Sequence, residues 1–188
     1  MKKVLTIAGV ALFALLSLGL TVEGKNYSAT AIVETKPVKL LGAGVRTKWM
    51  FDVYAMGVYT ESGKCSAKAL IGDEETKYLR IEMLRDVSAE KMAETLGEAF
   101  KEHMPKDASV ELKNQQQGLM TLFKDECKKD TVIEIIYTPE SGTLIKQNSK
   151  TIGTFPGKAF QSVLWDIYFG ENTCCSGLKD SVFKGCKK

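Results

Sequence analysis

The stretch Leu41-Gly42-Ala43-Gly44-Val45-Arg46, followed by Tyr54-Ala55-Met56-Gly57-Val58-Tyr59, is the most informative part of the sequence. The first two glycines mark a place where a strand can bulge or where its backbone can closely approach another segment. Residues 46–59 are rich in aromatic and β-branched side chains, which favour strands. We therefore expect a long strand from Arg46 to Tyr59 that is entered through a glycine-containing bulge.

Further strands are predicted on both sides of this stretch. Apolar side chains alternate with more polar ones around Leu79–Met83, as in a half-buried strand. A turn signal at Pro139–Gly142 separates two segments that can pair as a hairpin. The other expected strands are Tyr27–Thr35, Val38–Leu41, Thr131–Tyr137, Thr143–Lys146 and Thr151–Phe155.

Helices are predicted between and after these strands. Ser88 can cap the first turn of a helix whose apolar stripe runs from Met92 to Phe100 and which ends before Pro105. The other helices are expected from a cap at Asp107 to about Phe123, from Pro156 to Gly170, and near Leu178–Phe183. The order predicts one α+β domain in which helices cover an antiparallel sheet.

The N-terminus has the pattern of a secretory signal peptide. Lys2 and Lys3 precede an apolar run from Val4 to Leu20, and small residues follow at Val22-Glu23-Gly24. Cleavage after Gly24 would give a signal peptide over 1–24 and a mature domain over 25–188, in the periplasm or outside the cell. The alternative is an uncleaved anchor helix, because the run approaches the length that spans a bilayer.

The charge balance predicts no strong electrostatic partner. The chain has 26 basic and 23 acidic residues, and without Lys2, Lys3 and Glu23 these become 24 and 22. We therefore expect neither nucleic acid nor an anionic membrane surface as a partner, and no membrane span after signal cleavage.

Five cysteines are present, and export would allow disulfides to form. We expect Cys174 or Cys175 to pair with Cys186, and Cys65 with Cys127. No metal-ligand spacing is present and His103 is the single histidine, so no metal site is expected. No cofactor is expected either, because no helix follows Gly42-x-Gly44 to receive a phosphate.

Four motifs in order resemble the chalcone isomerase family, in particular its bacterial, exported branch. The first two are the G-x-G-x-R and A-x-G-V-Y segments quoted above, and the third is Val87-Ser88-Ala89-Glu90-Lys91-Met92. The fourth runs from Gly157-Lys158-Ala159-Phe160 through Trp165-Asp166-Ile167-Tyr168-Phe169-Gly170 to Leu178-Lys179. The resemblance implies an open-faced sandwich of a large antiparallel sheet and helices, with a ligand cleft between them.

The resemblance also implies which residues would carry out catalysis. Plant enzymes of the family close a chalcone to a flavanone with an arginine, a threonine, a tyrosine and an asparagine. Arg46 stands at the arginine position, and Tyr54 falls where the threonine would be. Ser88 falls near the tyrosine and Thr95 near the asparagine. Because Ser88 and Thr95 are too short to replace those side chains, the catalytic set is incomplete, and each lost donor to a developing oxyanion typically costs about 10²–10³ in rate.

The preferred hypothesis is therefore a non-catalytic protein that binds a small amphipathic ligand such as a fatty acid. Arg46 would anchor the polar head with help from Tyr54. The first alternative is an isomerase or intramolecular lyase that acts on an enone through Arg46, Tyr54, Ser88 and Thr95. The second is an exported structural or assembly factor whose cleft is filled by side chains.

Simpler explanations exist for the same residues. Arg46 could pair with a carboxylate or with loop carbonyls, and Tyr54 could be an ordinary half-buried strand tyrosine. We expect Trp49, Phe51, Tyr59 and Phe100 to belong to the core or at most to line a pocket. His103 has no partner in the sequence that indicates catalysis.

Overall fold

The computed structural model describes residues 19–186. The signal peptide predicted for 1–24 lies mostly outside this range. None of the described helices is both long and apolar enough to cross a bilayer.

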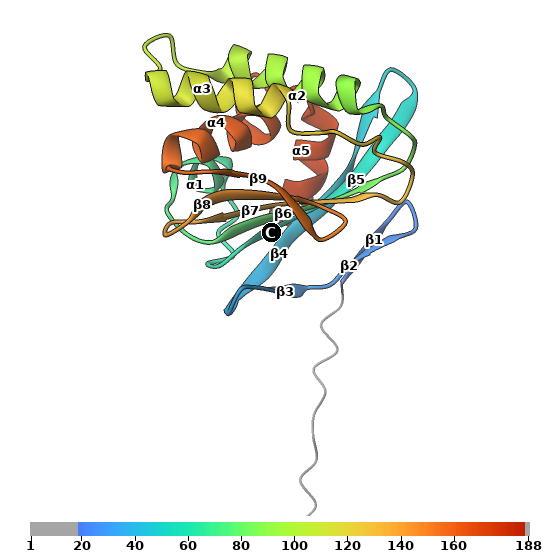
Figure 1. Ribbon diagram of the computed structural model, residues 1–188. Helices are drawn as coiled ribbons and strands as arrows, with labels where there is room; N and C mark the ends of the chain where they lie inside the picture. The colour runs from blue at the N-terminus through green and yellow to red at the C-terminus, as the bar shows by residue number, and fades with distance from the viewer. Residues whose placement is uncertain (1–18, 187–188) are drawn as a thin grey trace, which may run out of the picture.

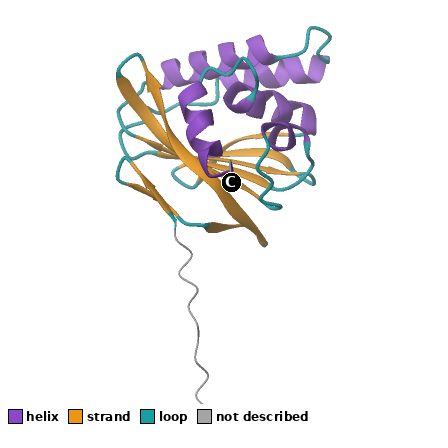
Figure 2. Ribbon diagram, turned by 180° about the vertical axis from the view of Figure 1, so that it is seen from behind, coloured by secondary structure: helices purple, strands orange, loops and turns teal. Residues whose placement is uncertain are grey.

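A seven-stranded antiparallel sheet forms one layer of the molecule, and the helices cover one of its faces (Figures 1 and 2). The strands follow one another in the sheet in sequence order, so each pairs with its neighbour along the chain. They are β3 (Thr30–Val33), β4 (Lys36–Lys48), β5 (Phe51–Thr60), β6 (Lys77–Met83), β7 (Val132–Thr138), β8 (Gly142–Gln147) and β9 (Lys150–Phe155). This arrangement confirms the predicted α+β class and the large antiparallel sheet.

The long strand expected from Arg46 to Tyr59 is instead parts of two strands. Strand β4 ends at Lys48, the chain turns at Trp49-Met50, and β5 returns antiparallel to it. Trp49 has a φ of 62°, in the left-handed region that glycine or asparagine usually occupies. The turn was missed because its residues are typical strand formers and give no turn signal.

A small hairpin precedes the main sheet. Strand β1 (Leu20–Val22) pairs antiparallel with β2 (Lys25–Tyr27) across a turn at Glu23-Gly24. The strand expected over Tyr27–Thr35 is thus divided between β2 and β3. Cleavage after Gly24, as predicted from the sequence, would remove β1 from this hairpin.

The two glycines of the first motif allow a helix to pack closely on the sheet. Helix α5 (Ser176–Phe183) lies against β4, and a Cβ atom on Gly42 would come within 2.1 Å of the Val182 carbonyl oxygen. A Cβ atom on Gly44 would lie 2.7 Å from the Ser181 Cβ. The register of β4 and β5 also shifts between Leu40 and Gly42. Both expectations for this motif, a bulge and a close approach, are therefore confirmed.

The four predicted helices are present, with bounds that differ from the expected ones by a few residues. Ser88 caps α2 (Ala89–His103), where its hydroxyl accepts a hydrogen bond of 3.2 Å from the Lys91 amide. Helix α3 (Val110–Met120) is capped by Ser109 and not by Asp107. Helix α4 (Lys158–Phe169) begins two residues after Pro156, and α1 (Ala67–Gly72) was not predicted. A 3₁₀ turn, η1 (Lys184–Cys186), follows α5.

The main core lies between the sheet and the helices. Tyr59 and Phe100 are buried as predicted, although Tyr59 packs on the other face of the sheet. Trp49 and Phe51 are exposed and do not belong to the core, but both line the cavity described below, which was the other expectation for them. Their place at the end of a hairpin, beyond the area that the helices cover, explains the difference.

The cysteine pairing also differs from the prediction. Cys65 forms a disulfide with Cys186, 121 residues away, while Cys127, Cys174 and Cys175 are free thiols. Neither expected pairing is present. Helix α5 and the turn η1 pack beside β4, and this packing brings Cys186 next to Cys65.

Candidate functional site

A cavity of about 450 Å³ lies between the sheet and helices α2 and α4. Most of its wall is apolar, with side chains from four strands, two helices and the segment after α3. These are Val53, Ile81, Ile133, Ile135 and Ile145 from the sheet, and Met92, Leu96, Ala99, Phe123 and Ile167 from the covering layer. The cavity is at the position that the sequence predicted for a cleft, between sheet and helices.

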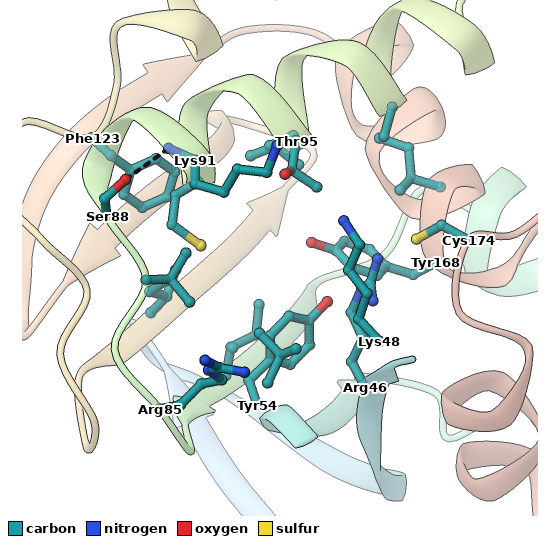
Figure 3. A pocket seen from close by; sticks show the side chains of 18 of the residues that line it. Arg46, Lys48, Tyr54, Arg85, Ser88, Lys91, Thr95, Phe123, Tyr168 and Cys174 are labelled. Carbon is teal, nitrogen blue, oxygen red and sulfur yellow. Dashed lines mark hydrogen bonds between the residues drawn. The ribbon is translucent and has the colours of Figure 1, made fainter. Parts of the chain in front are cut away.

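One group of polar side chains lies together on one side of this cavity (Figure 3). Arg46 near the end of β4 is paired in register with Tyr54 of β5, so their side chains lie on the same face of the sheet. Tyr168 of α4 and Cys174, in the segment between α4 and α5, complete this group. Four residues from three separate parts of the chain thus meet at one place.

The two tyrosine hydroxyls are suited to donate hydrogen bonds into the cavity. Figure 3 shows both hydroxyl oxygens directed into the same space beside the Arg46 side chain. Tyr54 and Tyr168 are each only 7% exposed. Burial raises the pKa of Tyr54 well above its ordinary value and also raises the pKa of Tyr168. Both phenols therefore keep their protons at neutral pH.

Arg46 has no carboxylate partner in the part of the chain that the structure describes. No carboxylate lies within ion-pair distance of Arg46, Lys48 or Arg85 in residues 19–186. The alternative in which Arg46 pairs with a carboxylate of the protein is therefore not supported. The half-buried guanidinium, which lies close to the Cys174 thiol, is instead available to an anionic ligand.

All four sequence-predicted site residues line this one cavity. Ser88 lies at the start of α2, and its hydroxyl already accepts a hydrogen bond from the Lys91 amide as the helix cap. Thr95 lies two turns further along α2, across the cavity from Arg46 (Figure 3). The structure brings Arg46 and Tyr54 together but leaves Ser88 and Thr95 on the opposite wall.

The Cys174 thiol lies in an environment that favours its ionised form. It accepts a hydrogen bond from the Cys175 thiol and lies close to the positive charge of Arg46, and these effects outweigh its partial burial. Together they lower the pKa of Cys174 below the ordinary value of a thiol. The pKa of Cys175, which donates that hydrogen bond and is buried, is raised.

Other chemistry-bearing groups do not extend the site. The Nδ1 atom of His103 lies 2.7 Å from Oδ2 of Asp166, which ties the end of α2 to α4. In residues 19–186, no group of three or more His, Cys, Asp or Glu side chains is arranged to hold a metal ion.

Sequence reasoning missed five residues of the site: Lys48, Arg85, Lys91, Tyr168 and Cys174. Tyr168 belongs to a motif that was recognised but given no role. The available signal was that Tyr168 follows Ile167 on the apolar face of the predicted helix, which indicates a phenol near the core. The three cations come from the end of β4, a loop and the first turn of α2, and nothing in their local sequence indicates that they line one cavity.

Comparison with known proteins gives a family match and a similar solved structure. A family model described as chalcone isomerase-like matches residues 19–183. The crystal structure of an Arabidopsis thaliana fatty-acid binding protein is similar to this chain, with a TM-score of 0.73 at 16% sequence identity. The match covers 89% of this chain and 97% of that one. No curated protein sequence matches. At this level of identity, the structural likeness shows a common fold.

Proposed function

Because the chain belongs to the chalcone isomerase-like family, we propose that its cavity binds a small amphipathic carboxylate, such as a fatty acid, without transforming it. One observation carries the proposal. On one side of an apolar cavity lie a guanidinium that pairs with no carboxylate of residues 19–186 and two buried phenols that remain protonated. This is the donor set that a single carboxylate requires when it enters a site largely shielded from water.

The apolar wall would supply most of the affinity. A cavity of about 450 Å³ lies within the range of roughly 300–1,000 Å³ typical of small-molecule sites. Each buried methylene group contributes about 0.8 kcal/mol. The polar group of Arg46, Tyr54 and Tyr168 would then set the orientation of the ligand, with the acyl chain along the isoleucines of the sheet.

Two further observations support binding without catalysis. The Arabidopsis thaliana protein of the same fold is described as a fatty-acid binding protein. In addition, the Ser88 hydroxyl serves as a helix cap and Thr95 lies across the cavity from Arg46. Neither is placed beside Tyr54 and Arg46 to complete a catalytic set.

An isomerase or intramolecular lyase acting on an enone is the second candidate. The observation that favours it is the convergence of two phenolic donors and Arg46, since such donors can also stabilise an enolate oxygen. The structural or assembly factor is less well supported, because it predicts a cleft filled by side chains and the structure has an open cavity.

Export to the periplasm or beyond is also part of the proposal. It is supported by the basic and apolar N-terminal pattern of the sequence. The Cys65–Cys186 disulfide is consistent with an oxidising compartment. The mass of the processed protein would give the cleavage position and decide whether β1 is retained.

The test is native mass spectrometry of the processed protein, recovered from the periplasm of an expression host. We expect extra mass that leaves on denaturation and that corresponds to fatty acids. The delipidated protein should then bind palmitate in calorimetry. Arg46→Ala should abolish this binding, while Arg80→Ala should not, because Arg80 lies on the other face of the sheet and pairs with Glu82.

The outcomes separate the candidates. Equal palmitate affinity of Arg46→Ala and the unmodified protein would refute the anchoring role. Turnover of a chalcone or another enone that is lost in Arg46→Ala would favour the isomerase. A protein that binds no ligand and turns over no enone would leave the assembly factor as the better hypothesis.

A further inference from the structure

The turn between β4 and β5 presents three consecutive apolar side chains to solvent. Trp49 is 92% exposed, Met50 83% and Phe51 55%. Figures 1 and 2 show this hairpin end extending beyond the rest of the sheet, to the level of the helical layer. The other large exposed apolar side chains of the described residues lie singly or on other elements: Leu20, Ile32, Val110 and Met120. A cluster of this kind marks an interaction surface.

Positive charge accompanies the cluster. Lys48 precedes Trp49, and the Arg85 guanidinium lies over the Phe51 ring at 4.9 Å from its centroid. Neither cation has an acidic partner in residues 19–186. The two carboxylates nearest in sequence, Asp52 and Asp86, form hydrogen bonds with other groups and no ion pair with Lys48 or Arg85. Asp52 accepts a hydrogen bond from the Thr47 hydroxyl, and Asp86 accepts one from the Lys129 amide.

The same residues form the rim of the ligand cavity. The cavity is lined by Lys48, Trp49, Phe51 and Arg85 in addition to its apolar wall. A surface on which the hairpin end rests would therefore also face the cavity opening. Whatever docks there has direct access to the space where a ligand would bind.

A lipid bilayer fits this surface better than a folded protein. The apolar part is a narrow convex hairpin end, whereas a specific protein interface usually buries more than about 1,000 Å² on complementary surfaces. Tryptophan is enriched at the boundary between headgroups and acyl chains, and basic residues beside it are attracted to anionic headgroups.

We propose that the hairpin end Lys48–Phe51 docks on anionic phospholipid bilayers and that the cavity exchanges its amphipathic ligand there. The docking part rests on the hairpin end alone. The exchange part rests on the function proposed above, and vesicle binding and palmitate binding are measured separately so that each can fail without the other. An overall charge near neutrality obscured this surface, because the sum of charges does not record where they cluster.

The test measures co-sedimentation of the full processed protein with vesicles of phosphatidylcholine alone or mixed with phosphatidylglycerol. Partitioning should be strong only with the anionic vesicles. Tryptophan fluorescence should shift to shorter wavelength on binding through Trp49 alone, because Trp165 is already fully buried. Lys48→Ala should weaken partitioning about fivefold, the effect of about 1 kcal/mol for one basic residue near the surface.

Met50→Asp and Val110→Asp form the matched pair. Met50 does not line the cavity, and Val110 is equally exposed but lies at the start of α3. We expect Met50→Asp to lower partitioning at least tenfold while its palmitate affinity in solution is retained. Val110→Asp should partition like the unmodified protein.

Several results would overturn the docking proposal. These are no partitioning of the unmodified protein, equal effects of the two aspartate variants, or self-association through the hairpin end without vesicle binding. Vesicle binding that requires Met50 in a protein that binds no fatty acid would instead confirm docking and refute the proposed ligand.

Discussion

Arg46 and Tyr54 are direct neighbours across the antiparallel strands β4 and β5, and both side chains line the cavity. In one continuous strand, as the sequence suggested, residues eight positions apart would be separated by about 26 Å, given about 3.3 Å per residue. The turn at Trp49-Met50 reduces this to the spacing of a cross-strand pair. The hairpin therefore creates the polar side of the site.

Tyr54→Phe should weaken fatty-acid binding without unfolding the protein. The lost hydroxyl would remove one hydrogen bond to a carboxylate, which contributes about 1.5–3 kcal/mol, or roughly 10- to 100-fold in affinity. Calorimetry with palmitate and a thermal melt measure the two effects. Tyr59→Phe is the control, because Tyr59 is buried on the other face of the sheet. Equal affinities of the two variants would contradict the role of Tyr54.

Cys174 should be the most reactive thiol of the protein. Because the pKa of Cys174 is lowered below the ordinary thiol value, its thiolate forms at lower pH than that of an unperturbed thiol, and alkylation should be faster at each pH. Cys127, whose pKa is raised to about 11 by burial, is the internal control. Peptide mass spectrometry after iodoacetamide treatment at pH 5, 6 and 7 measures both.

The same reaction reports on the cavity. Arg46→Ala should slow Cys174 alkylation at pH 6, because the nearby positive charge that favours the thiolate is removed. Palmitate should protect Cys174 from the reagent, since Cys174 lines the cavity. Alkylation that is indifferent to both changes would show that the thiol does not share the site of Arg46.

Gly42→Ala should destabilise the protein. The added Cβ would lie 2.1 Å from the Val182 carbonyl oxygen, so α5 must move away from β4. Overpacking of this kind typically costs about 1–3 kcal/mol, and in a chain of this size each kcal/mol lowers Tm by roughly 2–4 °C. Gly72→Ala is the control, because nothing lies within 4 Å of its added Cβ. Equal Tm values would contradict the close packing of α5.

Lys77→Met should stabilise the protein at neutral pH. Lys77 is completely buried, its amine has no hydrogen-bond partner, and it lies 5.6 Å from the centroid of the Tyr137 ring. Burial lowers the pKa of Lys77 to about 8. At about 1.4 kcal/mol per pKa unit, the fall from 10.5 to about 8 means that the charged amine costs roughly 3 kcal/mol at pH 7.

The pH dependence distinguishes this effect from a simple change in packing. Between pH 8 and 10.5 the unfolded chain binds more protons at Lys77 than the folded one, so the unmodified protein gains stability as the pH rises. The difference in the free energy of unfolding between Lys77→Met and the unmodified protein should therefore shrink from pH 7 to pH 9.5. Urea unfolding at each pH measures it, and a constant difference would refute the proposed cause.

The local features of the fold were predictable from the sequence. The Ser88 cap, the apolar stripe of α2, the β7–β8 hairpin and the bulge at Gly42 each depend on residues a few positions apart. Such patterns reflect backbone propensities and the alternation of side chains, which act over short distances. They were sufficient for the α+β class and, with the motif order, for the family. They also drew attention to Arg46 and Tyr54.

Contacts between distant segments were decided only by the tertiary structure. Three such contacts join residues from separate elements. Tyr168 and Cys174 lie beside Arg46, Cys65 is paired with Cys186, and Lys48 and Arg85 line the cavity rim with Trp49. None leaves a periodic signal, because each depends on how helices and strands pack rather than on the residues next to it. The sequence by itself therefore indicated most of the elements and the pair Arg46 and Tyr54 that we propose as the anchor, whereas packing of the helices on the sheet determined the cavity, its donors and its rim.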